Sequence, residues 1–230
     1  MSAVPFETFP ALDLPFVAHA FIQRIPGVDV QVDRQIALQR LDQFHAQVRA
    51  QLGFEEYAIG EQVHDCGIAV IAENGVCVDP SGIAAVVNAA PISGVDGLVT
   101  NRPGLCLGVQ VADCCPVYLV DPVSRCIGLV HSGRKGTELG IAPQAISKMK
   151  AHFGSNPIDL LVQLGPCIRP PLYEVNIAQE IVRQCRAAGV RNVFDCAANT
   201  GEDLLRYYSY RVEKGKTGRM LALLGMKPRG

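Results

Sequence analysis

The sequence has few charged residues and almost no net charge. Lysine and arginine number 21 and aspartate and glutamate 22, so charged residues make up 19% of the chain and the formal net charge is −1. Such a balance offers neither the basic surface that nucleic acids require nor a polybasic membrane patch, and we expect no nucleic-acid partner. Because hydrophobic residues make up 49% of the chain, a disordered protein is excluded.

The sequence also lacks a targeting signal and a long apolar run. No basic start followed by an apolar core occurs near the N-terminus, so we expect no secretory signal peptide. The longest uncharged stretch, residues 80–95, contains Asn88 and Pro91 and is shorter than the roughly 20 residues of a membrane-spanning helix. These absences predict a cytoplasmic protein without a membrane partner.

Cysteine occurs nine times, an odd number, in a chain without an export signal. A disulfide framework is therefore not expected, and we predict reduced thiols. Most of the cysteines stand in apolar surroundings and are predicted to be small core residues: Cys66, Cys77, Cys106, Cys126, Cys185 and Cys196.

No internal repeat or linker divides the chain, so we predict one domain over residues 1–230. Apolar periodicity predicts helices at 36–52, 137–153 (with Leu139 on the apolar face) and 176–188 (with Asn176 as N-cap). Strands are predicted at 16–23, 57–63, 67–72, 126–130, 158–164 and 219–224, with turns over 73–97 and doubly buried strands within 98–120. This mixture predicts a mixed α/β or α+β domain.

Histidine is scarce, with only five residues. His45 and His152 fall on predicted helices near charged neighbours and are predicted to lie at the surface, whereas His19 lies within a strand and also fits a core position. His64 and His131 are each expected to end a strand. Strand ends that lead into loops are common places for functional sites.

Cys114 is likewise expected at a strand end, next to Asp113. Two imidazoles and one thiolate would form a tetrahedral metal site with an open fourth position, as in a catalytic zinc centre. However, 50 residues separate His64 from Cys114 and 17 separate Cys114 from His131, which is no local metal signature. The residues alone leave two interpretations, a metal site or three unrelated, partly buried side chains.

The segment HSGRKG at 131–136 lies between a predicted strand and a predicted helix. Its small residues expose backbone N–H groups, and Arg134 and Lys135 add positive charge, so a phosphate site is one interpretation. An ordinary turn with solvated basic residues is the other. The segment GPCI at 165–168 marks a sharp turn, in which Cys167 is either a nucleophile or a packed residue.

Several ordered blocks together resemble the laccase-domain family, also called polyphenol-oxidase-like or purine nucleoside phosphorylase laccase-domain proteins. The blocks span most of the chain: HAFIQRIPGV at 19–28, QVH at 62–64, DGLVTNRPGLCLGVQVADCCPV at 96–117, HSGRKG at 131–136, GPCI at 165–168, YEV at 173–175, SYR at 209–211 and TGRM at 217–220. Each block is weakly specific alone, and the ordered series is highly specific.

The resemblance implies that His64, Cys114 and His131 bind zinc. It also implies a mixed β-sheet sandwich flanked by helices, like the catalytic domains of cytotoxic necrotizing factors. The activities associated with the family are phosphorolysis of purine nucleosides (adenosine, inosine, guanosine and methylthioadenosine), with phosphate as co-substrate, and deamination of adenosine. The partner implied is thus a small-molecule nucleoside, and the oligomeric state stays open.

The chain departs from the family pattern at positions that bear on the substrate. The pair Arg134 and Lys135 stands where the family has Trp-Arg, and Asp65 and Arg169 each replace a glycine. The stretch after Tyr173 is shorter than in the family. These departures leave the three predicted ligands intact.

The identity of the metal can be approached by counting ligands. Five histidines are too few for a multicopper centre within one chain. A single His-Cys-His copper site is compatible with the ligand set, but such a site usually has a weak axial methionine. None of the four methionines shares a motif with the ligands: Met1, Met149, Met220 and Met226. We therefore prefer zinc to copper.

The expected roles follow from this chemistry. Asp113 or Asp65 would transfer protons near the metal, since a general acid or base must lie within hydrogen-bond reach. Arg134 and Lys135 would hold phosphate, with Arg24 and Asn101 as further substrate-binding candidates.

Three alternatives stay open. The first is a metal-free hydrolase with Cys114 as nucleophile and His131 as base. The second is a copper-dependent phenol oxidoreductase. The third is an interaction protein that has lost its activity, and the departures from the family pattern would be the sign of this loss.

Overall fold

The computed structural model describes residues 3–73, 77–78 and 91–228. Its strands are β1 (Phe6–Glu7), β2 (Val17–Ile22), β3 (Glu56–Ile59), β4 (Ile68–Ile71), β5 (Cys77–Val78), β6 (Gly97–Thr100), β7 (Leu105–Val111), β8 (Cys115–Asp121), β9 (Cys126–Ser132), β10 (Leu161–Leu164), β11 (Asn192–Asp195) and β12 (Met220–Met226). Its helices are α1 (Arg34–Gln51), α2 (Arg134–Glu138), α3 (Ile141–Phe153) and α4 (Ile177–Ala187), with 3-10 turns at Pro10–Leu12 and Pro157–Asp159.

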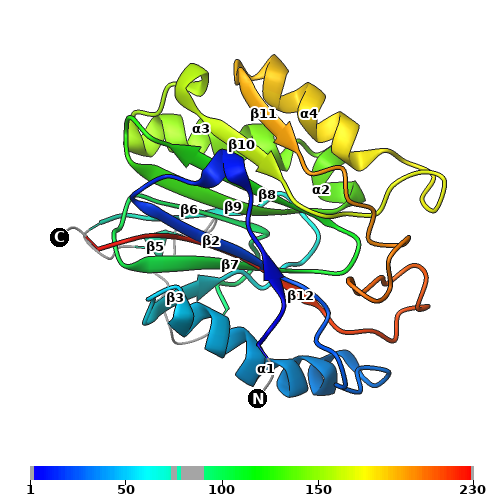
Figure 1. Ribbon diagram of the computed structural model, residues 1–230. Helices are drawn as coiled ribbons and strands as arrows, with labels where there is room; N and C mark the ends of the chain where they lie inside the picture. Colours follow the sequence, from blue (N-terminus) through cyan, green and yellow to red (C-terminus); the bar gives the residue numbers. More distant parts are fainter. Residues whose placement is uncertain (1–2, 74–76, 79–90, 229–230) are drawn as a thin grey trace.

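Two stacked sheets form the body of the molecule, with helices on their outer faces (Figure 1). Within the described residues, one sheet has the strand order β1-β2-β12-β7-β3 and the other β11-β10-β8-β9-β6-β4-β5. Each sheet combines antiparallel pairs with parallel ones, such as β3 with β7 and β10 with β11. The predicted mixed sandwich flanked by helices is thus confirmed, while its similarity to cytotoxic necrotizing factors stays a prediction.

The core has two layers because the central strands are buried on both faces. Along β8, Tyr118 and Val120 point into the cluster between the sheets, whereas Val117 and Leu119 point into the cluster under α3 and α4. Successive side chains of a strand face opposite sides, so a strand between two layers must be apolar at every position. The doubly buried strands predicted within 98–120 are therefore confirmed as β6, β7 and β8.

The helices differ from the prediction at one point. The helix expected over 137–153 is two helices, α2 and α3, because Gly140 adopts the left-handed conformation with φ of 73°. Leu139, expected on the apolar face, is 45% exposed at this break. By contrast, Asn176 caps α4 as predicted, since its side chain accepts a hydrogen bond from the Gln179 N–H.

Two of the predicted strand ends are wrong. The strand expected over 57–63 ends at Ile59, and His64 lies in the loop that follows. Cys114 lies in the turn between β7 and β8, where Asp113 has φ of 85°. The edge strand β11 was not predicted, because most of its residues are exposed and give no apolar pattern.

The remaining histidines have separate environments. His19 is a buried core residue whose Nε2 accepts a hydrogen bond from the Phe9 N–H. His45 was expected at the surface, but it is only 6% exposed because it lies on the inner face of α1. His152 is exposed, as predicted.

The described cysteines are free thiols, and Cys106, Cys126 and Cys185 are buried as predicted. Cys66 and Cys196 are only half-buried, while the side chain of Cys77 and most of the turns expected over 73–97 lie outside the described residues. Cys167 is fully buried, which favours its interpretation as a packed residue. Among the described helices, none is long and apolar enough to cross a membrane.

Candidate metal centre

Three side chains from separate parts of the chain meet at one point. The ligand atoms of His64, Cys114 and His131 all lie within 4.8 Å of one another. Among the described residues, this is the one such group of three or more His, Cys, Asp or Glu side chains. The two imidazole rings stand nearly perpendicular, with their centroids 4.8 Å apart. The fold therefore brings together the trio that the sequence suggested.

The loop that carries His64 is held in an uncommon backbone conformation. Gln62 and His64 have φ of 59° and 60°, in the left-handed region that side chains rarely adopt. The Gln62 side chain donates a hydrogen bond to the Gln110 carbonyl at 2.7 Å and accepts one from the Gln110 N–H at 2.8 Å. Because Gln110 lies in β7, this pair of hydrogen bonds fixes the loop against the sheet.

Asp96 is the buried acceptor behind the trio. One of its carboxylate oxygens accepts hydrogen bonds from His131 Nδ1 at 2.8 Å and from the His64 N–H at 2.9 Å. The other accepts from the Asp65 N–H at 2.9 Å. Since Nδ1 of His131 faces the carboxylate, Nε2 is left as its ligand atom. Carboxylate–histidine pairs of this kind orient metal ligands and raise their basicity.

The charges within the trio favour a thiolate. Burial raises the pKa of the Cys114 thiol, but His131 and His64 outweigh burial and lower this pKa to about 6. Burial lowers the pKa of His131, whereas Cys114 and Asp96 raise it, to about 9. At neutral pH the metal-free site therefore holds a thiolate beside an imidazolium. The thiolate is the form of cysteine that binds metals.

The donor set fits a zinc ion. Two imidazole nitrogens and one thiolate sulfur supply three tetrahedral positions, and the cavity described below leaves the fourth side open. Gly133 allows this close approach, because a Cβ there would lie 2.9 Å from the Cys114 Sγ. His64, Cys114 and His131 are thus the residues that would hold the metal.

A multicopper centre does not fit these residues. His19, His45 and His152 lie elsewhere in the fold, so two histidines at most are available to the site. Of the described methionines, none lines the cavity, and Met220 instead accepts a hydrogen bond from the Tyr208 N–H. Among the described residues, the trio therefore offers ligands for one metal ion and not for several.

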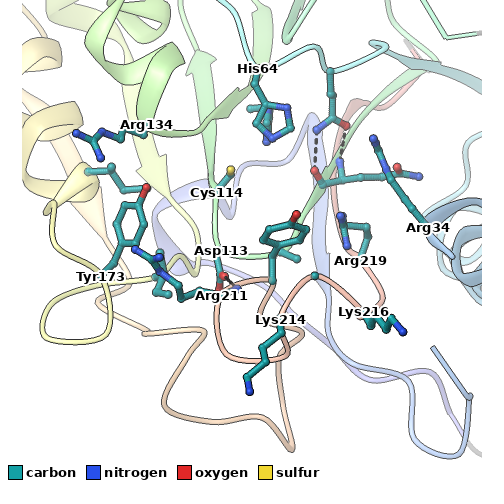
Figure 2. Close-up of a pocket in the computed structure, with 18 of the residues that line it drawn as sticks. Arg34, His64, Asp113, Cys114, Arg134, Tyr173, Arg211, Lys214, Lys216 and Arg219 are labelled. Carbon is teal, nitrogen blue, oxygen red and sulfur yellow. Dashed lines mark hydrogen bonds between the residues drawn. The ribbon is translucent and has the colours of Figure 1, made fainter. Parts of the chain in front are cut away.

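The trio lies at the wall of a cavity of about 1200 Å³ (Figure 2). Tyr173 and Tyr210 supply aromatic surface to its lining. The charged lining residues are six bases and three acids: Arg34, Arg134, Arg211, Lys214, Lys216, Arg219, Asp33, Asp113 and Glu174. This excess of positive charge contrasts with the near-neutral chain as a whole.

The predicted catalytic acid or base, Asp113, lines the cavity, but its two carboxylate oxygens already have partners. One accepts a hydrogen bond from Thr200 Oγ1 at 2.7 Å and the other from the Arg211 N–H at 2.7 Å. Asp113 therefore ties two distant loops to the turn that carries Cys114. Its role in proton transfer stays a prediction.

The predicted phosphate-binding residues are distributed differently. Arg134 lines the cavity and pairs with Glu138 and Glu174. Lys135 is not part of the lining, and its Nζ lies 2.6 Å from a carboxylate oxygen of Asp65.

Arg24 and Asn101, the further substrate-binding candidates, also lie outside the cavity lining. Arg24 pairs with Glu213 at 2.7 Å and stacks on the Tyr208 ring. Asn101 follows β6, and its Oδ1 is buried without a partner among the described residues. The structure thus does not bring Arg24 or Asn101 to the trio.

Sequence reasoning missed several residues of the site. Asp96 and Gln62 stand within the blocks at 96–117 and 62–64, but neither was singled out. Both residues could have been found from the sequence, because a polar residue within an otherwise apolar block must have a buried hydrogen-bond partner. Arg34, Lys214 and Lys216 gave no signal, since charged residues in helices and turns are ordinarily solvated.

The fold and the site together define a class of protein: a two-sheet α+β protein in which a His-Cys-His group lies at the wall of a cationic cavity. The family described as "Multi-copper polyphenol oxidoreductase laccase" matches residues 28–182 and 175–227, and the chain belongs to this family. The family resemblance of the sequence blocks is thereby confirmed. Its printed name refers to several coppers, which the ligand set of this chain does not accommodate.

Curated relatives carry a different name. "Purine nucleoside phosphorylase" of Deinococcus radiodurans is 29% identical over 98% of this chain and 94% of its own length. "Purine nucleoside phosphorylase SSP1584" of Staphylococcus saprophyticus is 32% identical over 76% of this chain and 75% of its own. The crystal structure of YlmD from Geobacillus stearothermophilus matches with a TM-score of 0.77 and 25% identity, over 96% of this chain and 94% of that one.

Proposed function

We propose that this protein is a zinc-dependent purine nucleoside phosphorylase. Its substrates would be adenosine, inosine, guanosine and methylthioadenosine, with inorganic phosphate as co-substrate. The observation that carries the proposal is the meeting of His64, Cys114 and His131 within 4.8 Å at the wall of a cavity with aromatic and cationic lining. The names of the curated relatives support the reaction.

Phosphorolysis needs a site that holds two reactants together. Phosphate attacks C1′ of the ribose, the C1′–N9 bond breaks, and the leaving base takes up the proton that the attacking phosphate gives up. A zinc ion at the trio would supply Lewis acidity to the substrate atom that it contacts. The residues of the cavity would hold the purine against Tyr173 and Tyr210 and hold the phosphate by cationic side chains.

We expect the zinc-loaded protein to release free base from inosine only when phosphate is present. Chromatography of base, nucleoside and ribose 1-phosphate measures this reaction directly. The Cys114→Ala variant, which lacks the thiolate ligand, provides the negative control. Release of base in the absence of phosphate, or no release from any of the four nucleosides, would contradict the phosphorylase proposal.

Deamination of adenosine is the second activity that we propose for this centre. It requires attack of water at C6, release of ammonia, and a group near the metal that moves a proton. The same incubation distinguishes the two reactions, because deamination converts adenosine to inosine with or without phosphate. Adenosine that yields only adenine and ribose 1-phosphate would exclude it.

A metal-free cysteine hydrolase is favoured as the alternative by one observation, the close approach of the Cys114 sulfur and the His131 imidazole. We expect the thiolate absorbance of metal-free protein to appear as the pH rises through about 6, because the pKa of Cys114 is lowered from 9.0. The Cys114→Ala variant should lack this transition, and bound zinc should block alkylation of the thiol. A transition near pH 9 would show that the pair does not form.

Metal content then separates the two mechanisms. A thiolate bound to zinc is not free to attack a substrate. Activity that survives metal chelation and disappears on alkylation would favour the hydrolase, and activity restored by zinc would favour the phosphorylase.

A further inference from the structure

Four cations line the part of the cavity that lies away from Arg134, and we call Arg34, Lys214, Lys216 and Arg219 the basic wall. Arg34 is the first residue of α1, and the other three belong to the segment that leads into β12. Figure 2 shows Arg34, Arg219 and Lys216 together on the side opposite Arg134, with Lys214 below the trio. Segments far apart in the sequence therefore place their charges at one side of the cavity.

The basic wall differs from the other cations of the cavity in its lack of counter-charges. On the opposite side, Glu174 pairs with both Arg134 and Arg211, and Glu138 adds a second partner for Arg134. Among the described residues, no carboxylate forms an ion pair with any member of the basic wall. Unpaired cations that share a concave surface concentrate anions there.

The two acids nearest in sequence to the basic wall have other partners. Glu213 pairs with Arg24 and accepts hydrogen bonds from the Ser209 N–H and Thr217 Oγ1. Asp33 caps α1 by accepting a hydrogen bond from the Gln35 N–H at 2.8 Å. Neither of these two carboxylates forms an ion pair with a member of the basic wall.

Arg219 is held in place without a charged partner. Its guanidinium donates hydrogen bonds to the carbonyls of Gly218 at 2.9 Å and Thr217 at 3.3 Å. Burial and the nearby Arg34 charge both lower the pKa of Arg219. Two like charges beside each other are unfavourable unless an anion lies between or near them. The arrangement thus has the charge pattern of an anion site.

We propose that the basic wall binds a phosphate group during the reaction. This inference rests on the proposed phosphorylase function and assigns its anion subsite to Arg34, Lys216 and Arg219, with Lys214 at the edge. A phosphate dianion accepts several charge-assisted hydrogen bonds at once, which matches a cluster of unpaired guanidinium and ammonium groups. The group would come from free phosphate or from the 5′-phosphate of a nucleotide substrate.

The test uses three double variants that each remove two positive charges from the zinc-loaded protein. Arg34→Gln/Lys216→Gln changes the basic wall, Arg134→Gln/Lys135→Gln changes the opposite side, and Lys148→Gln/Lys150→Gln changes exposed lysines of α3 outside the cavity lining. Calorimetry measures binding of inorganic phosphate, inosine 5′-monophosphate and inosine. Kinetics measures KM for phosphate and the same nucleoside and nucleotide.

We expect Arg34→Gln/Lys216→Gln to weaken binding of phosphate, of inosine 5′-monophosphate or of both by about tenfold or more. Inosine, which lacks a phosphate group, should bind as before, and this shows that the cavity is intact. Weaker binding of inorganic phosphate assigns the basic wall as the co-substrate subsite. Weaker binding of the nucleotide alone assigns it as a 5′-phosphate subsite. The α3 variant should leave all three affinities unchanged.

Equal affinities for phosphate and for the nucleotide in the wild type and the basic-wall variant would overturn the inference. A larger loss of these affinities in Arg134→Gln/Lys135→Gln than in the basic-wall variant would also overturn it. Failure of the anion subsite and failure of the proposed function give different results. If phosphate binding depends on the basic wall but no nucleoside is cleaved, the function fails and the subsite stands. If nucleosides are cleaved with an unchanged KM for phosphate and for the nucleotide, the function stands and the subsite fails.

Discussion

Cys114→Ala should abolish metal binding and, with it, nucleoside cleavage. The variant removes the single sulfur donor of the trio and leaves two imidazoles, which hold zinc far more weakly than three ligands do. Loss of residues that merely support metal ligands already costs about 10–100-fold in affinity, so loss of a ligand should cost at least about 100-fold. Elemental analysis after dialysis and a competition titration with a zinc chelator measure the loss.

Cys196→Ala is the matched control for this experiment. Cys196 is another half-buried thiol, but it does not line the cavity. Its replacement should leave one zinc per chain and full activity. A Cys114→Ala protein that still binds zinc with wild-type affinity would remove Cys114 from the ligand set, and one that is metal-free yet active would remove the metal from the reaction.

Asp96→Asn should weaken metal binding and destabilise the fold at the same time. The side chain of Asp96 is buried and accepts hydrogen bonds from His131 Nδ1 and from the N–H groups of His64 and Asp65. An amide offers one acceptor oxygen, so its NH₂ group must face at least one of these donors. We expect zinc affinity to fall about 10–100-fold and the free energy of unfolding to fall by about 1–3 kcal/mol.

The control for the Asp96→Asn variant is a substitution at a second buried aspartate, which lies outside the cavity lining. Asp121 is fully buried at the turn between β8 and β9 and accepts hydrogen bonds from the N–H groups of Val123 and Ser124. Asp121→Ala, which leaves both N–H groups without their acceptor, should lower the free energy of unfolding in urea but leave zinc affinity unchanged. If both variants lost zinc affinity equally, the effect of Asp96 would be general destabilisation rather than orientation of His131.

The distribution of charge in the cavity changes the interpretation of the segment at 131–136. The sequence places Arg134 and Lys135 beside a metal ligand, which suggests a phosphate site there. In the structure, Lys135 pairs with Asp65, and Arg134 pairs with two glutamates. Lys135 is therefore paired outside the cavity lining, and the charge of Arg134 is balanced by two carboxylates.

The sequence by itself determined the class of fold and pointed to His64, Cys114 and His131 as a group. Continuous apolar runs over 98–120 and 126–130 specified strands buried on both faces, because only such strands lack an exposed side. The ordered blocks specified His64, Cys114 and His131 through a family resemblance, while their spacing alone left the trio undecided. Local signals also predicted the Asn176 cap, which depends on neighbouring residues only.

Only the tertiary structure decided which groups surround the trio. The hydrogen bonds of Asp96 to the His64 loop and to β9, the burial of His45 and the pairing of Lys135 with Asp65 depend on segments distant in the sequence. The basic wall likewise joins Arg34 from α1 to Arg219 from the segment before β12. Charges and hydrogen bonds act through space, so their partners follow from the packing of the two sheets and not from local sequence patterns.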